Sequence, residues 1–271
     1  MKYTLENSIA LAVKILENNT GYILNRNIID RIFEMTRKEH FKEKEDITMR
    51  LSVVDSFYST NMNQRIFGFS DLADEIHHIG DDSAIIEEVE KYKKSKNSKI
   101  DDILEKEYGI RKSGKPAGKA RSLITKYLYF VTKHNIPIED NLIKNNINNV
   151  LSYFDKEIFS GDILRDLIGF CTAENLDFSE FDNFMWLLGK VNKGSFSLIL
   201  KKNAYEGIVN TLGIKGEKSS DFDKNFANSI RDVKNISKIK EYISEDIFNF
   251  LMLNIDIMDE TEKNATHTLL W

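Results

Sequence analysis

Proline is almost absent from this chain of 271 residues, and its only two, Pro116 and Pro137, flank one stretch with the pattern of a helix. Since proline interrupts helices, two prolines and 13 glycines favour long helices joined by short links. Hydrophobic residues make up 41% of the chain, which suffices for a sizeable core. We therefore expect an all-α fold of about ten to fourteen helices.

Apolar residues recur with the spacing of an amphipathic helix along most of the chain. The clearest windows are 4–18, 27–39, 46–60 and 64–79. Another helix should begin with Asp82-Ser83 as its cap. Two more should follow Asp140 and Ser160-Gly161-Asp162. A strongly apolar helix over 179–189 should close at Gly189. Residues 195–200 are the best short candidate for a strand.

The C-terminal part shows shorter helical patterns, at 221–232, 236–242 and 245–256. We therefore expect a core of residues 1–203 and a helical extension over 204–271.

Composition also limits the function classes. A single cysteine, Cys171, excludes a disulfide framework and a cysteine-based zinc site. The only close histidine pair, His77-His78, is a poor chelate because adjacent helical residues point about 100° apart. The first helix carries charges, and no apolar run approaches the length of a membrane span. We expect a cytoplasmic protein without metal, cofactor or membrane contact.

Positive charge is concentrated in a chain that is otherwise acidic. Residues 91–126 hold twelve Lys or Arg against four acids, a net charge of +8 within a chain of net charge −5. Residues 111–126 contain no acid, and Gly114 and Gly118 there would let backbone N–H groups approach a phosphate. This segregation predicts a surface that faces a polyanion.

The basic loop leads into a helix with the apolar stripe Leu123, Tyr127, Phe130 and Val131, and the next helix opens with the acids Glu139-Asp140. A carboxylate one helix-length after a phosphate-binding loop is what a reaction on a sugar–base bond requires, since positive charge develops on the sugar. The helix dipole at this position would favour the ionised form of Asp140. The alternative role of Asp140 is that of an N-cap, and the two roles can coexist.

The order of these motifs resembles that of the helix-hairpin-helix DNA glycosylases, the superfamily of endonuclease III and 8-oxoguanine DNA glycosylase. The resemblance covers about residues 45–150 and rests on the Ser/Asn-rich turn 56–66, on Gly118-Lys119-Ala120, and on Ile136-Pro137-Ile138-Glu139-Asp140. The chain departs from the family in lacking the apolar anchor of the hairpin, in having one extra residue before Asp140, and in lacking a four-cysteine cluster.

The resemblance implies roles for individual residues. The matching acid is Asp140 or its neighbour Glu139, and Lys119 takes the place of the lysine that attacks C1′, with a phosphate contact as its alternative. Asn61 would fill the hole left by the flipped base, unless it is a plain helix cap, and Arg65 would contact the orphaned base. The remaining expected DNA-binding residues are Lys112, Gly114, Lys115, Gly118, Arg121 and Lys126. The alternative for Lys126 is that it lies on a solvated face of its helix and has no role in binding.

The expected function is therefore that of a DNA glycosylase, with or without strand cleavage, in repair or in defence against phage. It should act on double-stranded DNA as a monomer, with its site in a cleft between a lobe of residues 45–150 and a lobe of the remaining helices. A non-catalytic DNA-binding protein and a helical interaction module are the alternatives.

Overall fold

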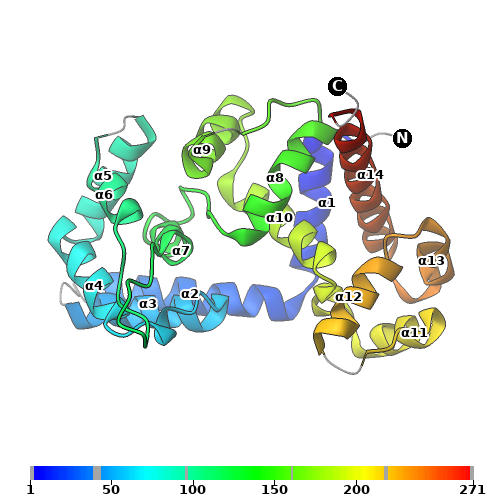
Figure 1. Ribbon diagram of the computed structural model, residues 1–271, viewed down its shortest axis with the longest axis horizontal. Helices are drawn as coiled ribbons and strands as arrows, with labels where there is room; N and C mark the ends of the chain where they lie inside the picture. Colours follow the sequence, from blue (N-terminus) through cyan, green and yellow to red (C-terminus); the bar gives the residue numbers. More distant parts are fainter. Residues whose placement is uncertain (1–2, 39–43, 95–96, 160, 217–218, 269–271) are drawn as a thin grey trace. The chain divides into compact units, whose positions relative to one another are not determined.

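The computed structural model describes residues 3–38, 44–94, 97–159, 161–216 and 219–268, so that Lys96, Ser160 and parts of the extension 204–271 lie outside the described residues. The described chain folds into fourteen α-helices and three short 3-10 helices, with isolated bridges but no strand (Figure 1). The expected all-α class and number of helices are confirmed.

The helices belong to two compact units, each assembled from segments that are distant in sequence. Unit 1 comprises residues 1–20, 142–161 and 180–271. It holds α1 (Leu5–Glu17), most of α8 (Asn141–Tyr153) and of α10 (Phe178–Asn192), η2 (Ser195–Ile199), α11 (Lys202–Leu212), α12 (Ser219–Ser229), α13 (Val233–Lys238), η3 (Lys240–Tyr242) and α14 (Glu245–Thr268). The sequence-based boundary near residue 203 falls inside this unit, in which α1 packs against α14.

Unit 2 comprises residues 21–141 and 162–179 and contains every residue that the sequence analysis selected for a site. It holds most of α2 (Thr20–Lys38), α3 (Lys44–Tyr58), η1 (Met62–Gln64), α4 (Gly68–Ile79), α5 (Asp82–Lys94), α6 (Lys99–Glu105), α7 (Arg121–Val131) and α9 (Ile163–Ala173). The helix windows predicted at the N-terminal end of the chain correspond to α1, α2, α3 and α4.

Helix α7 forms the centre of unit 2. All its residues from Leu123 to Val131 are buried, and it packs against α3, α5 and α6. A helix surrounded on all sides has to be apolar around most of its circumference, which explains the length of its hydrophobic run. The ring of Phe130 lies 5.5 Å from Phe33 and 5.2 Å from Tyr129, measured between centroids. The predicted apolar stripe is therefore the core of this unit.

We expect Phe130→Ala to destabilise unit 2 by about 3–5 kcal/mol, because the ring is buried and its removal leaves a cavity. Hydrogen exchange of the α7 amides measures this loss without requiring the whole chain to unfold in one step. Phe57→Ala is the matched control, since the Phe57 ring is exposed and should change exchange by less than about 0.5 kcal/mol. Equal effects of the two substitutions would contradict the assignment of α7 as the core.

Three local expectations were wrong. The strand candidate 195–200 instead contains the 3-10 helix η2 (Ser195–Ile199), which follows Gly194 with a positive φ, and the segment has no strand to pair with among the described residues. Gly189 lies inside α10, where a Cβ atom would come within 2.9 Å of Leu142, so the glycine permits close packing against α8. The cap of α5 is Asp81, whose carboxylate accepts from the Ala84 amide at 3.1 Å.

Two helices were not predicted, α6 and α11. Helix α6 follows a Lys/Ser/Asn run that resembles a solvated loop, yet Ser98 and Asp101 form a complete capping box at its start. Asp82, the expected cap, instead accepts from the guanidinium groups of Arg37 and Arg50 inside unit 2. A local capping box therefore explains the start of α6, whereas α11 begins without a side-chain cap.

Candidate nucleic-acid interface

The predicted Gly-rich basic loop is a backbone hairpin between α6 and α7, which we call the basic hairpin (residues 107–119). Its two arms are joined by hydrogen bonds from the Tyr108 amide to the Gly118 carbonyl at 3.2 Å and from the Ala117 amide to the Gly109 carbonyl at 3.0 Å. At its tip the Arg111 amide donates to the Lys115 carbonyl at 2.8 Å. The basic loop is thus a hairpin with strand-like pairing of its two arms.

Unpaired positive charge is concentrated at the tip of this hairpin. Arg111, Lys112 and Lys115 are exposed, and none of them forms an ion pair within the described residues. Most other cations of the basic segment have carboxylate partners, namely Lys91, Lys93, Lys106, Lys119, Arg121 and Lys126. The net charge of the segment therefore overstates the charge that is available to bind phosphate, and the tip holds the largest group of cations without an ion pair among the described residues of the segment.

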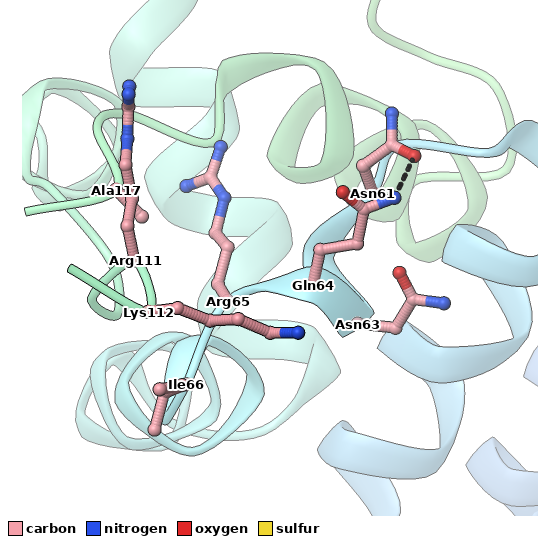
Figure 2. A pocket seen from close by; sticks show the side chains of 8 residues that line it. All are labelled: Asn61, Asn63, Gln64, Arg65, Ile66, Arg111, Lys112 and Ala117. Carbon is pink, nitrogen blue, oxygen red and sulfur yellow. Dashed lines mark hydrogen bonds between the residues drawn. The ribbon is translucent and has the colours of Figure 1, made fainter.

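The Ser/Asn-rich turn packs against the basic hairpin. Ile66 and Ile110 exchange two backbone hydrogen bonds, each 2.9 Å long. Between the turn and the hairpin lies an open hollow of about 780 Å³ (Figure 2). It is lined by Asn61, Asn63, Gln64, Arg65, Ile66, Arg111, Lys112 and Ala117. The structure thus brings together three of the predicted DNA-binding residues, Asn61, Arg65 and Lys112, while Gly114 and Lys115 lie at the hairpin tip outside the lining.

Arg65 links the two segments. Its guanidinium donates to the carbonyl oxygens of Gly118 at 2.7 Å and Lys119 at 3.0 Å and has no carboxylate partner within the described residues. Burial and the neighbouring charge of Arg111 lower the pKa of Arg65. An anion bound in the hollow would relieve this repulsion between the two cations.

The Asn-rich turn is held from beneath by a residue that the sequence analysis missed. Asp55 is buried, and its carboxylate accepts from the Met62 amide at 2.9 Å, from the Asn63 amide at 3.3 Å and from the Thr60 hydroxyl. Asn61 occupies the N-cap position of η1 in a left-handed conformation with φ of 62°, but its side chain forms no capping hydrogen bond. The sequence feature that could have identified Asp55 is its position as a polar residue on the apolar face of α3.

We expect Asp55→Ala to loosen the turn by about 1–3 kcal/mol, since it leaves buried amide donors without an acceptor. Hydrogen exchange in residues 59–67 should accelerate, whereas α7 amides should keep their protection. Asp55→Asn retains one carbonyl oxygen and should give a smaller effect. Unchanged exchange in both variants would show that Asp55 does not hold the turn.

The two predicted acids differ in their surroundings. Glu139 has a side chain that is 3% exposed, and Arg121 donates to it with Nε at 2.9 Å and with Nη2 at 2.7 Å. Arg121 also donates to Asp162 at 2.9 Å and to Glu105 at 2.5 Å. Burial disfavours the charge of Arg121, but the hydrogen bonds and charges of these acids outweigh it and raise its pKa. Arg121 and Glu139 thus form a buried ion pair.

Asp140 directly precedes α8, as expected, and contacts a lysine that was not expected there. Lys126 Nζ donates to Asp140 Oδ2 at 3.0 Å and to Ser122 Oγ at 2.9 Å. It also lies 5.3 Å from the centroid of the Tyr58 ring. The Lys126 side chain is only 3% exposed, so the expected solvated face is wrong. The available signal was its spacing, three residues after Leu123 and four before Phe130 on the apolar stripe.

Lys119, the expected catalytic lysine, lies at the end of the basic hairpin and pairs with Glu105. Its side chain is 47% exposed. Neither Lys119 nor Asp140 lines the hollow beside Asn61. Among the described residues no cluster of His, Cys, Asp or Glu could hold a metal ion, and no described helix is long and apolar enough to cross a membrane.

Comparisons with protein-family models, curated proteins and solved structures find no match to this chain. The resemblance to helix-hairpin-helix glycosylases therefore stays a prediction from the order of motifs. Three features of unit 2 bear on the function: the cations at the hairpin tip, the hollow, and the Lys126–Asp140 pair.

Proposed function

We propose that this protein is a DNA glycosylase that binds duplex DNA through the tip of its basic hairpin and cleaves an N-glycosidic bond with Asp140. The observation that carries the proposal is the pairing of Asp140 with Lys126 at 3.0 Å in the same unit as the unpaired cations of the hairpin. A carboxylate stabilises the positive charge that develops on the sugar, and a lysine amine is the nucleophile of glycosylases that also cleave the strand.

Exposure favours Asp140 over Glu139 as the acid. Asp140 has a side chain that is 18% exposed, whereas that of Glu139 is 3% exposed and accepts three hydrogen bonds from Arg121. A group that has to face a sugar needs at least one accessible oxygen. Glu139 serves instead to anchor the start of α7 to the segment before α8.

Two observations point to different amines: contact with Asp140 favours Lys126, whereas exposure favours Lys119, whose side chain is 47% exposed against 3% for Lys126. In the proposed covalent branch, Lys126 Nζ in its neutral form would attack C1′, the bond between C1′ and the base nitrogen would break, and the base would leave with the bonding electrons. Since Asp140 is the immediate acceptor of a proton from Lys126, the pair can exchange that proton without a third group. In the hydrolytic branch, Lys126 holds Asp140 in position while the carboxylate orients water.

The test is incubation of the protein with duplexes that carry a panel of modified bases, followed by detection of abasic sites. Release of a base from at least one duplex is the expected result. If the protein binds DNA but releases no base from any duplex, the second candidate function, described next, takes the place of the glycosylase proposal.

That second candidate is a non-catalytic DNA-binding protein on the same scaffold. It is favoured by the fact that both acids are neutralised by buried cations, Glu139 by Arg121 and Asp140 by Lys126. Ion pairs of this kind also serve as purely structural connections between elements. The two candidates make the same prediction for DNA binding and differ in base release.

A further inference from the structure

Phe67 is the most exposed of the large apolar side chains in the described residues, with 65% of its surface accessible to water. It also adopts a left-handed backbone conformation, with φ of 63°. Such a conformation is unfavourable for a bulky residue and persists only where the surroundings impose it. Phe67 therefore combines an unfavourable backbone conformation with an unfavourable exposure.

The surroundings do impose this conformation. On one side, Ile66 is bonded in both directions to Ile110 of the basic hairpin. On the other side, Gly68 is buried where a Cβ atom would come within 2.6 Å of Met62 Sδ, and the Phe67 carbonyl accepts from the Asp71 amide at 2.9 Å in the first turn of α4. Because both neighbours are fixed, the Phe67 ring is presented at a defined place.

Phe67 follows directly on the lining of the cationic hollow in sequence. The preceding residue, Ile66, is itself 42% exposed and lines the hollow together with Arg111 and Lys112 (Figure 2). Among the described residues, no acidic side chain lines it. An exposed aromatic ring one residue away from the lining of a hollow that holds unpaired cations matches a nucleic acid, whose phosphates attract the cations and whose bases stack on the ring. Charge complementarity thus selects DNA over an apolar protein partner.

We propose that Phe67 is the residue that inserts between stacked bases of the bound duplex, with Ile66 extending the apolar wedge. This inference rests on the proposed DNA binding and deepens it. It moves the wedge role from Asn61, a polar side chain whose Oδ1 accepts from Gln64 Nε2 at 3.1 Å, to an apolar side chain whose chain neighbour Ile66 lines the same hollow. Apolar wedges unstack base steps and kink the duplex, which facilitates the extrusion of a base.

The experiment uses the full-length protein and a duplex that contains the fluorescent base 2-aminopurine, whose emission rises when it leaves the stack. The wild type should raise the emission on binding, and Phe67→Ala should lose most of this rise. Affinity should fall about five- to hundred-fold, since stacking on one base contributes about 1–3 kcal/mol. The salt dependence of binding should not change, because the ring contacts no phosphate.

Two further variants separate a loss of function from a loss of folding. Phe67→Leu keeps an apolar side chain and should retain most of the emission rise. Phe67→Gly removes both the ring and the unfavourable conformation, so its melting temperature should equal or exceed that of the wild type while the emission rise is lost. Met35→Ala, at an exposed apolar residue of α2, is the matched control and should behave as the wild type.

The outcomes are distinguishable. If Phe67→Ala binds the duplex and raises emission as the wild type does, the wedge assignment is overturned while the DNA-binding proposal stands. If the wild type binds no duplex in a salt-dependent manner, the proposed function fails and the wedge assignment with it. Binding of single strands alone, with no effect on a duplex, would also overturn the insertion.

Discussion

Asp140→Asn should reduce base excision by about 10²–10³-fold, the usual effect of removing one preorganised electrostatic group from an active site. The substitution keeps the size of the side chain and an oxygen that accepts from Lys126, and asparagine caps helices about as well as aspartate. What disappears is the negative charge. DNA binding should persist or tighten, because a charge that repels phosphate has been removed. Abasic sites are scored on the duplex that the wild type cleaves best.

Because Lys126 is buried, the effect of Asp140→Asn on stability has to be separated from its effect on catalysis by a second substitution at Lys126. Asp140→Asn leaves the Lys126 charge, which is 3% exposed, without its carboxylate, and breaking a buried pair in this way costs about 3–5 kcal/mol. The double variant Lys126→Gln/Asp140→Asn removes both charges and should recover part of that stability. If its excision stays lost while its melting temperature recovers, the loss reflects chemistry and not folding.

Glu139→Gln should act mainly on stability, because Glu139 is buried against Arg121. Excision by the folded fraction should stay within about tenfold of the wild type, since Arg121 keeps Glu105 and Asp162 as partners. If Glu139→Gln folds but is inactive while Asp140→Asn stays active, the catalytic acid is Glu139 and not Asp140.

Borohydride trapping distinguishes the two lysines in the covalent branch. A trapped complex that survives Lys119→Gln and is lost in Lys126→Gln supports Lys126 as the amine, and the reverse pattern supports Lys119. A protein that releases a base but forms no trapped complex uses water, with Lys126 as a positioning residue for Asp140.

Neutralising Arg111, Lys112 and Lys115 together should weaken binding to every duplex and flatten its salt dependence. Each lost phosphate contact lowers the slope of log affinity against log salt by about 0.9, so three contacts remove about 2.7 from the slope. These are the cations of the basic hairpin without ion pairs within the described residues, and they are exposed at its tip. Affinity is measured by fluorescence anisotropy at several salt concentrations.

The matched control replaces three paired lysines of the same segment, Lys91, Lys93 and Lys106, by glutamine. Each has a glutamate partner, so each already has its charge offset in the free protein. The slope should change much less than in the hairpin variant. Equal slopes in both variants, or an unchanged slope in the hairpin variant, would place the DNA surface elsewhere.

The amino-acid sequence by itself determined the helical class and the core of unit 2. The stripe Leu123, Tyr127, Phe130 and Val131 predicted a buried helix, and α7 is buried along this whole run. The sequence also predicted helix starts after Asp140 and after Asp162, where α8 and α9 begin. These features depend on residues within a few positions of one another, where helical periodicity and capping act directly.

The tertiary structure alone decided which side chains meet. Lys126 and Asp140 are fourteen residues apart, and Ile66 and Ile110 are forty-four apart, so no local pattern contains their contact. Folding also pairs Arg121 and Lys126 with acids, whereas the three cations at the hairpin tip have no ion pair within the described residues. The left-handed Phe67 is likewise imposed by packing on both sides. Packing energies between distant segments outweigh the local preferences from which a sequence is interpreted.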